Sequence, residues 1–319
     1  MRRPRIDVRG IGKSYGEVAA LVDVSLQVEA GTVLGVLGHN GAGKTTLIDI
    51  LSTRTRPTTG SAAVCGWDVL RHGAKVRRHI GMTGQFVAVD DAMTGHANLV
   101  LIARLLGANA RQAKDRAAVL LATFGLDDAA FRKAGTYSGG MRRRLDLAAS
   151  LIGRPQVLFL DEPTTGLDPM SRNDLWRFVE DLADAGTTVV LTTQYLEEAD
   201  RLADEVVVLA GGRVVATGTP DQLKRGLGER VATVTFRDPA AARYAVATLA
   251  WVGMRPAPAP EQRSTAVPIS GQGDIARLVR CLDSVGIAIY DLSVSEPTLN
   301  DVYLALHNAA LHNAARTTR

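Results

Sequence analysis

The feature that most constrains this fold is a glycine-rich loop set between an apolar run and a helical segment. The loop Gly38–Thr45 has the sequence GHNGAGKT, which fits the pattern GxxxxGK followed by Ser or Thr, and it follows the apolar run Val33–Leu37. Glycines allow such a loop to fold around phosphate groups, and the following helix presents its positive N-terminus to them. The lysine of this pattern, Lys44, can reach the β and γ phosphates, and the hydroxyl of Thr45 can bind Mg²⁺. The loop therefore predicts a site for a nucleoside triphosphate.

Two adjacent carboxylates follow a second apolar run. Asp161 and Glu162 come directly after Val157–Leu160. Ligands of α/β proteins gather at the carboxyl ends of buried strands, so both acids are expected near the phosphates. We expect Asp161 to hold Mg²⁺ through a water and Glu162 to orient or deprotonate the attacking water. In the alternative interpretation these acids only cap the next helix, and the presence of the phosphate-binding loop favours the functional one.

A serine and two glycines, Ser138–Gly140, precede a helical segment that begins with three arginines, Arg142–Arg144. The serine can cap this helix, and the glycines allow a phosphate to approach the backbone closely. The turn therefore predicts a second anion-binding position. A simply capped helix is the alternative.

Composition excludes several other classes of protein. The 319 residues are 46% hydrophobic and 22% charged, and no apolar run approaches the roughly 18 residues of a membrane helix. No apolar run follows the basic start of the chain, so no secretory signal is expected. Cys65 and Cys281 lie far apart without CxxC spacing, which argues against a disulfide framework or a zinc site. The net charge is only +4, with one cluster at Arg142–Arg144 and another in the first five residues, so no nucleic-acid partner is expected.

The first 225 residues alternate short apolar runs with helical segments, which is typical of an α/β fold with buried strands. Val206–Leu209 and Val214–Ala216 flank the pair Gly211 and Gly212 and predict a hairpin. A short helix is expected to follow Thr219.

The remaining residues predict a small α+β domain without catalytic chemistry of its own. Its expected elements are strands at Val231–Phe236, near Val267 and at Ile287–Val294, helices at Ala240–Trp251, Asp274–Val285 and from Pro297, and an extended connector at Arg255–Pro260. We therefore expect one domain at residues 1–228 and a second at residues 229–319.

The order of these motifs resembles the nucleotide-binding subunit of ABC transporters, from Ile6 to Leu223. The resemblance identifies Gly38–Thr45 as Walker A, Tyr137–Met141 as the signature motif, Val157–Glu162 as Walker B and Gly166–Asp168 as the D-loop. It implies the nucleotide-binding residues Tyr15, which stacks on adenine, and Gly38, His39, Asn40, Gly41, Ala42, Gly43, Lys44, Thr45, Thr46, Gln85, Ser138, Gly139 and Gly140. It also implies the metal ligands Thr45, Gln85 and Asp161 and the catalytic residues Glu162, Gln194 and Asp168.

The chain departs from the family pattern at its switch residue. Gln194 stands where the family usually has a histidine, and an amide cannot titrate, although it can donate a hydrogen bond to the γ phosphate. Tyr137 and Met141 replace the usual Leu and Gln of the signature but leave Ser138 and both glycines in place. We therefore expect Glu162 to act as the base and Gln194 to position phosphate.

Two further segments, residues 192–200 (TTQYLEEAD) and Glu296–Leu304, resemble the ATP-binding subunits of daunorubicin/doxorubicin resistance transporters, so the resemblance covers the whole chain. It implies a P-loop ABC ATPase domain, with a RecA-like core, an antiparallel β part and a helical insert at about residues 85–140, followed by the small α+β domain. It further implies a Mg²⁺-dependent ATPase that forms a homodimer and drives a separate polytopic membrane permease, which exports hydrophobic drugs, antibiotics or lipids. The chain would then lie peripherally at the cytoplasmic face of the membrane, with the stretch Val87–Met93 near the permease. A soluble ABC ATPase acting on ribosomes or DNA and an importer ATPase are the alternatives.

Overall fold

The computed structural model describes residues 4–83, 89–227, 230–258, 262–295 and 298–303. The chain forms two compact units, Met1–Pro220 and Asp221–Arg319. The units part at the start of helix α8 (Pro220–Leu227), whereas the predicted domain boundary, residue 228, lies after that helix.

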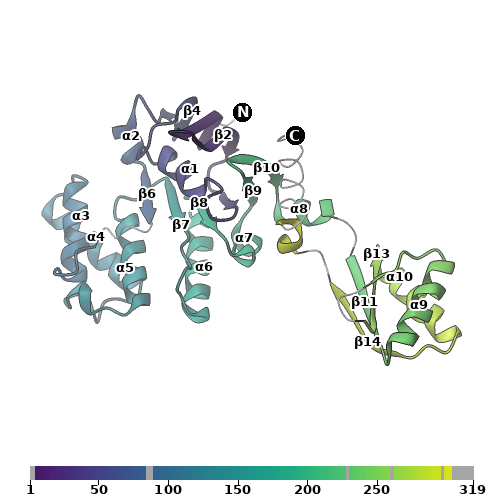
Figure 1. Cartoon of the computed structure of the whole chain (residues 1–319). Coiled ribbons are helices and arrows are strands. Elements are labelled where there is room, and N and C mark those ends of the chain that lie inside the picture. Colours follow the sequence, from purple (N-terminus) through teal and green to yellow (C-terminus); the bar gives the residue numbers. More distant parts are fainter. Residues whose placement is uncertain (1–3, 84–88, 228–229, 259–261, 296–297, 304–319) are drawn as a thin grey trace. The chain divides into compact units, whose positions relative to one another are not determined.

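A six-stranded sheet forms the centre of the first unit (Figure 1). Its strand order is β10 (Arg213–Gly218), β9 (Glu205–Ala210), β3 (Val33–Leu37), β8 (Thr188–Thr193), β7 (Val157–Asp161) and β6 (Ile80–Thr83). All neighbours are parallel except β9 and β10, which form the predicted hairpin across Gly211 and Gly212. The apolar runs predicted as buried strands are therefore strands of one sheet.

Both faces of this sheet are covered. Leu158 and Leu160 of β7 lie in one apolar cluster, whereas Val157 and Phe159 lie in a second cluster with helix α1 (Lys44–Leu51). The first cluster includes residues of the helices α3 (Gly95–Leu105), α4 (Ala110–Thr123), α5 (Gly139–Leu151) and α6 (Pro169–Asp184). All four of these β7 side chains are fully buried. Because both faces of the strand are covered, none of these side chains reaches water. The strand is therefore apolar at all four positions and does not alternate between apolar and polar residues.

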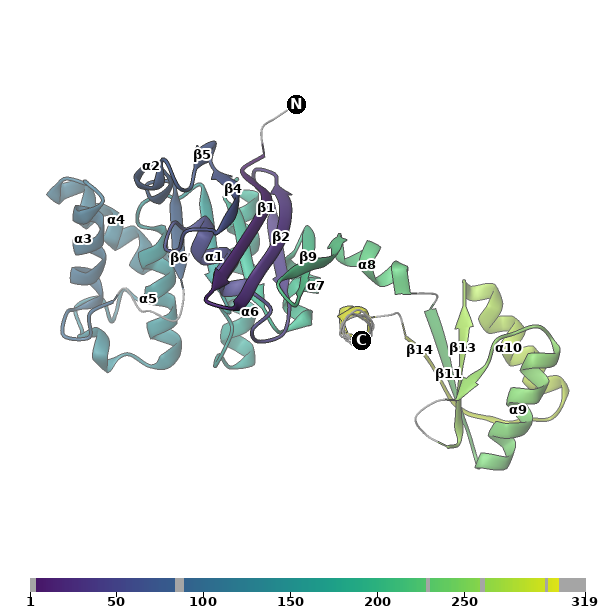
Figure 2. The same cartoon turned by 45° about the horizontal axis from the view of Figure 1, so that its top comes forward.

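An antiparallel sheet shares the second cluster with α1. Its order is β2 (Val18–Val28), β1 (Ile6–Tyr15), β4 (Thr59–Val64) and β5 (Trp67–Asp68), and Figure 2 brings β1 and β2 to the front. Gly60 has a φ of +80°, and a Cβ there would lie 2.2 Å from the carbonyl oxygen of Gly10 on β1. Only glycine permits this close pairing of β4 with β1.

The predicted helical insert, residues 85–140, contains α3 (Gly95–Leu105) and α4 (Ala110–Thr123), which lie beside α5 (Gly139–Leu151) in Figure 1. Asn109 starts α4 with a capping box, and the side chain of Ser138 caps α5 by accepting a hydrogen bond from the amide of Met141. The short α2 (Gly73–Arg77) precedes β6, α6 (Pro169–Asp184) follows β7, and α7 (Leu196–Leu202) follows β8. Among the described residues, no helix is both long enough and apolar enough to cross a membrane.

After α8, the described part of the second unit contains a four-stranded antiparallel sheet and the two helices α9 (Pro239–Trp251) and α10 (Gln272–Ser284). The strand order is β12 (Ala257–Pro258), β13 (Ser264–Ile269), β11 (Arg230–Phe236) and β14 (Ile289–Ser295). Residues 299–303 are also helical, and Pro297, where we expected a last helix to begin, lies outside the described residues.

The prediction of an irregular connector at Arg255–Pro260 is wrong at Ala257 and Pro258. Ala257 and Pro258 pair with β13 as an edge strand, and the carbonyl of Ala257 accepts a hydrogen bond from the hydroxyl of Thr265. A proline is tolerated at the edge of a sheet because its missing N–H is not needed there.

Phe236 gives a test of the core of this second unit. Phe236 is fully buried in a cluster with apolar residues of α9, α10 and β13. We expect Phe236→Ala to lower the free energy of unfolding of this unit by about 3–5 kcal/mol, because the cavity cannot collapse completely. Denaturant titration of the full-length chain measures the loss. Trp251→Ala, at a side chain that is 89% exposed, is the control and should change stability by less than about 0.5 kcal/mol; equal losses for the two variants would contradict the assignment of this core.

Candidate active site

The carboxyl ends of three adjacent strands bring the sequence motifs together. Leu37 of β3 is level with Thr193 of β8, and Thr192 of β8 is level with Asp161 of β7. The glycine-rich loop, the acidic pair and Gln194 begin at the ends of these strands. They therefore lie at one edge of the sheet, as the pattern of apolar runs predicts.

The loop after β3 requires glycine at two positions. A Cβ on Gly38 would lie 2.6 Å from the carbonyl oxygen of Leu209, and a Cβ on Gly43 would lie 2.6 Å from the carbonyl oxygen of Ala20. Gly43 also has a φ of +103° and is the residue from which α1 starts, without a side-chain cap. The first amides of α1 are therefore available to an anion in the loop, which fits a phosphate cradle.

Lys44 curls back over this loop. Its Nζ donates to the carbonyl of Gly38 at 2.6 Å and to that of His39 at 3.3 Å, and it lies 3.8 Å from Oε1 of Glu162. Only 5% of Lys44 is exposed, and this burial lowers the pKa of its ammonium, an effect that the charges of Glu162 and Asp161 partly offset. A positive charge is thus held inside the loop, where a polyphosphate would satisfy it.

The predicted metal ligands Thr45 and Asp161 are neighbours. The hydroxyl of Thr45 donates to Oδ2 of Asp161 at 3.3 Å, and Oδ1 of the same carboxylate accepts a hydrogen bond of 2.5 Å from the hydroxyl of Thr192. Asp161 is 7% exposed, so one bond fixes its orientation while the other oxygen faces Thr45. A hydroxyl and a carboxylate at this separation form an oxygen donor set that fits Mg²⁺.

Glu162 occupies a strained position beside them. It has a φ of +47°, a left-handed conformation that costs a residue other than glycine on the order of 1–3 kcal/mol. Its amide donates to the carbonyl and hydroxyl oxygens of Thr192 at 3.0 and 3.1 Å, and its carboxylate accepts from the hydroxyl of Thr165 at 3.4 Å. In this conformation its Oε1 lies 3.8 Å from Nζ of Lys44.

A cavity of about 410 Å³ contains most of the predicted nucleotide-binding residues. Tyr15, at the end of β1, stands half exposed at this cavity, and the ammonium of Lys13 lies 4.7 Å from the centre of its ring. The cavity is lined by Tyr15, Ala20, His39, Asn40, Gly41, Gly43, Lys44, Thr45, Thr46 and Glu162.

The signature and D-loop residues lie elsewhere in the same chain. Gly139 lines a second cavity of about 320 Å³ with Asp161 and Glu162, whereas Ser138 and Gly140 are not among the residues that line the cavity of Lys44. Asp168 caps α6 by accepting from the amides of Met170 and Ser171 and from the hydroxyl of Ser171, bonds that lower the pKa of its carboxyl group. Ser138, Gly139 and Asp168 are exposed and Gly140 is partly buried, and none of them lines the cavity of Lys44.

The last two predicted site residues are Gln194 and Gln85. Gln194 is exposed directly after β8, at the same edge of the sheet as Glu162. Gln85, predicted to bind both nucleotide and metal, lies outside the described residues.

Glu198, a fully buried carboxylate on α7, was not predicted from the sequence. It accepts hydrogen bonds of 3.3 Å from the hydroxyl of Thr164 and from the indole N–H of Trp176. Burial raises the pKa of Glu198 above its usual value, although hydrogen bonds from Thr193, Trp176 and Thr164 oppose this shift. The burial of Glu198 could have been predicted from its spacing, because it lies four residues before the buried Leu202 and so on the apolar face of the helix.

Comparisons with known proteins define the class. The family model described as "ABC transporter" matches residues 21–165. The chain is 47% identical to the daunorubicin resistance ATP-binding protein DrrA3 of Streptomyces coeruleorubidus, over 94% of this chain and 95% of that protein. It is 45% identical to the doxorubicin resistance ATP-binding protein DrrA of Mycobacterium tuberculosis, over 94% and 92%. The Nod factor export ATP-binding protein I of Burkholderia orbicola is 39% identical, over 75% and 79%.

Solved structures share the fold of about two thirds of this chain. One, described as the ATP-binding subunit of an ABC transporter, is 27% identical with a TM-score of 0.64, over 69% of this chain and 92% of that one. A dimeric bacterial ABC transporter cassette is 25% identical with a TM-score of 0.62, over 67% and 98%.

This chain belongs to the ATP-binding subunits of ABC transporters. Within that class it is a member of the daunorubicin/doxorubicin resistance family, to which it is similar over almost its whole length. The resemblance and the fold class predicted from the motifs are thereby confirmed.

The pH dependence of stability tests the burial of Glu198. The carboxyl group of Glu198 holds its proton more tightly in the folded protein than in the unfolded chain. The contribution of Glu198 to stability therefore falls as the pH rises from 4.5, the usual pKa of a glutamate, through the raised pKa of the folded state. We expect the melting temperature of the wild type relative to Glu198→Gln to decrease between pH 5 and pH 8, as measured by differential scanning calorimetry.

Glu197→Gln is the matched control, because Glu197 is the exposed neighbour on the same helix. Its melting temperature relative to the wild type should stay constant over this range. A wild type that gains stability relative to Glu198→Gln on going to pH 8 would contradict the assignment.

Proposed function

We propose that two copies of this chain bind and hydrolyse ATP between them and thereby drive a separate polytopic membrane permease that exports hydrophobic drugs, antibiotics or lipids. The observation that carries the proposal is the grouping of Lys44, Thr45, Asp161 and Glu162 at one edge of the central sheet. A buried cation, a metal-binding oxygen pair and a carboxylate are the groups that phosphoryl transfer to water requires. In this role the chain is a peripheral protein at the cytoplasmic face of the membrane.

The 410 Å³ cavity is the proposed ATP site. The amides of the loop and the start of α1 bind the phosphates, and Lys44 exchanges its bonds to the carbonyls of Gly38 and His39 for the β and γ phosphates. The ring of Tyr15 stacks on the adenine. Bound Mg²⁺ supplies charge neutralisation on the phosphates, and Thr45 and Asp161 are the described residues that hold it.

Glu162 is the proposed general base. Its carboxylate lies beside Lys44, at the place where the γ phosphate would end, and it can accept the proton of the attacking water. Gln194 follows the neighbouring strand and donates a hydrogen bond to the γ phosphate without exchanging a proton. Proton transfer in this chain therefore does not depend on a switch imidazole.

The exposure of the signature turn supports the homodimer. Ser138, Gly139 and Asp168 are all exposed, and Ser138 begins a helix whose N-terminus can stabilise a negative charge. In a head-to-tail dimer, this turn completes the ATP site of the second copy, and Asp168 lies across the same interface. ATP becomes part of the interface, so hydrolysis opens it.

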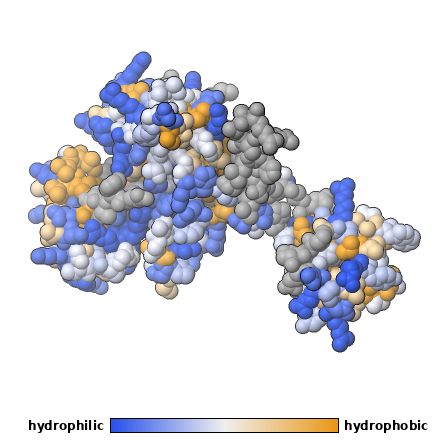
Figure 3. Space-filling view, viewed as in Figure 1, coloured by the Kyte–Doolittle hydropathy of each residue, from blue (hydrophilic) through white to orange (hydrophobic). Residues whose placement is uncertain are grey.

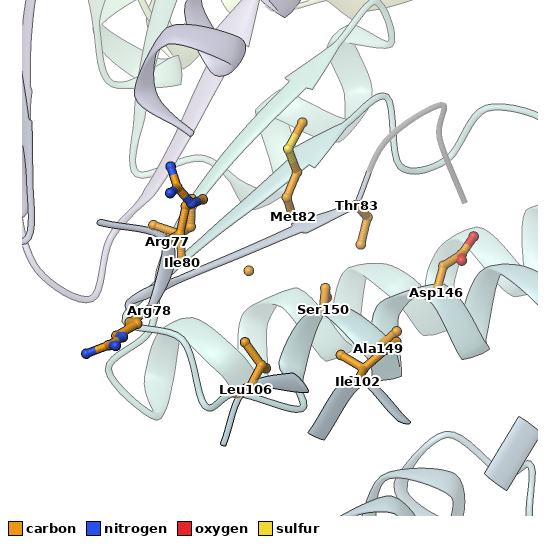
Figure 4. Close-up of a pocket in the computed structure, with 12 residues that line it drawn as sticks. Arg77, Arg78, Ile80, Met82, Thr83, Ile102, Leu106, Asp146, Ala149 and Ser150 are labelled. Carbon is orange, nitrogen blue, oxygen red and sulfur yellow. The ribbon is translucent and has the colours of Figure 1, made fainter. Parts of the chain in front are cut away.

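The permease is proposed to contact the helical insert. A cavity of about 170 Å³ lies between β6, the end of α3 and α5 (Figure 4), and its lining includes Met82, Ile102 and Leu106. Hydrophobic side chains gather over the neighbouring surface of α3 and α4 in Figure 3, where Leu101, Leu105, Leu106 and Val119 are exposed. An apolar surface next to a cavity is suited to receive a short helix from a partner protein. It lies on the same insert as the stretch Val87–Met93 that we expected near the permease, of which residues 87 and 88 lie outside the described part.

Substitution of the proposed base tests the chemistry. We expect Glu162→Gln to lower steady-state phosphate release at least about a hundredfold, because the amide cannot accept the proton, while ATP binding is kept. Gln194→Ala should reduce kcat by a smaller factor, about tenfold, because it only positions phosphate. Intact hydrolysis in Glu162→Gln, or no change in Gln194→Ala, would show these roles to be wrong.

Copurification tests the transporter role. The tagged chain is expressed in its native cells, the membranes are solubilised gently, and we expect a polytopic membrane protein to copurify at a fixed ratio. Leu106→Asp places a charge in the apolar surface and should reduce the recovery of that partner, whereas Leu70→Asp, at an exposed leucine outside the insert, should not. A chain recovered only from the cytosol, on ribosomes or DNA, would favour the soluble alternative.

A further inference from the structure

The conformation of Glu162 needs support from outside its own strand. Its φ of +47° is rare for a residue other than glycine, and the residue after it is Pro163. The residue that precedes a proline is normally driven toward extended conformations, because the proline ring clashes with helical ones. The backbone of the proposed base therefore holds a conformation that both its own Cβ and the next residue oppose.

Two hydrogen-bonded contacts hold this segment, one on each side of the strained residue. On the strand side, the amide of Glu162 donates to Thr192, as described above. On the other side, Nε of Arg143 donates to the carbonyl oxygen of Pro163 at 3.0 Å. Pro163 is buried, so water cannot readily replace this donor. The peptide that carries Glu162 is thus fixed at both ends.

The guanidinium of Arg143 is held in a position that costs free energy. Burial lowers the pKa of its guanidinium, and its Nη2 is buried with no hydrogen-bond partner among the described residues. Three carboxylates, Asp146, Glu198 and Asp161, lie near enough to offset part of this burial. A buried cation with an unused donor is a costly way to satisfy one carbonyl group.

The two neighbouring arginines of α5 contact other segments. Arg142 forms an ion pair with Asp91 and donates to the carbonyl of Val89, whereas Arg144 donates to the carbonyl of Phe124 at 3.2 Å. Of the three, Arg143 alone bonds to the residue that follows Glu162. Successive positions of one helix therefore reach three different loops.

We propose that Arg143 is a positioning residue for Glu162, which it holds in its left-handed conformation through the carbonyl of Pro163. The inference rests on the proposed function, in which Glu162 is the base. Arg143 stands five residues after Ser138 on the same helix, so the helix that carries the signature turn also orients the base of its own chain. Loss of the bond lets the carboxylate leave the place where it meets the attacking water.

Two substitutions of equal length separate the donor from the rest of the side chain. In Arg143→Gln, the amide nitrogen lies the same number of bonds from Cα as Nε does in arginine, so the donor to Pro163 is kept. Arg143→Met has a similar length but no donor. Phosphate release and binding of a fluorescent ATP analogue are measured on the full-length chain. We expect kcat to fall about tenfold or more in Arg143→Met and to stay within about twofold of the wild type in Arg143→Gln, with ATP affinity unchanged in both.

The assembly state gives a second readout. A chain that binds ATP but hydrolyses it slowly accumulates as an ATP-bound dimer, so Arg143→Met and Glu162→Gln should both elute as dimers in size-exclusion chromatography with ATP. Arg144→Met is the matched control: it removes the neighbouring arginine and its bond to a loop carbonyl, and its kcat should stay near that of the wild type.

The outcomes distinguish this inference from the proposed function. If Glu162→Gln abolishes hydrolysis while Arg143→Met hydrolyses ATP like the wild type, the positioning role is overturned and the proposed function stands. If Arg143→Gln is as slow as Arg143→Met, or if Arg143→Met loses ATP binding together with its fold, the hydrogen bond does not position the base and the inference is also overturned. If Glu162→Gln hydrolyses ATP normally, both fail.

Discussion

The parallel alignment of β3, β8 and β7 is the constraint on which the rest of the first unit depends. Because these strands are buried on both faces, their side chains pack into two separate apolar clusters, and polar groups are excluded until the strands end. The ends are level, so the loop of Lys44, the acids Asp161 and Glu162 and the segment at Gln194 all emerge at one edge. The register of the three strands therefore sets the position of the site, and the loops after the strands supply its side chains.

Hydrogen bonds between distant segments then complete the site. Thr192 of β8 makes the central contacts. Its hydroxyl donates to Asp161 and accepts from the amide of Glu162, so β8 orients both acids at the end of β7. Glu198 ties the turn after Glu162 to α6 and α7, and Arg143 ties the same turn to α5. The turn between the acidic pair and Asp168 is thereby connected to three helices, and movement of any one of them would reach Glu162.

The sequence predicted the strands, the hairpin and the phosphate-binding loop because each is governed by local chemistry. Val33–Leu37 and Val157–Leu160 are continuously apolar because both faces are covered, and the loop carries glycines where a Cβ would collide with Ala20 or Leu209. The roles of Arg143 and Glu198 could not be predicted from the sequence alone, because their partners lie 20 to 34 residues away and the contacts exist only after the helices have packed. The edge strand Ala257–Pro258 was missed for the same reason: its composition is typical of a stiff connector, and only β13 makes it a strand. The roles of the site residues stay predictions.

The left-handed backbone of Glu162 also bears on how such a protein can be engineered. Glycine adopts this conformation without strain, so replacing Glu162 with glycine relieves a cost that the folded chain otherwise carries. Selection for heat resistance alone can therefore act against the proposed base, because the strain and the carboxylate come with the same residue. Stability and turnover therefore place opposite demands on this residue, and a screen that measures only stability selects against turnover.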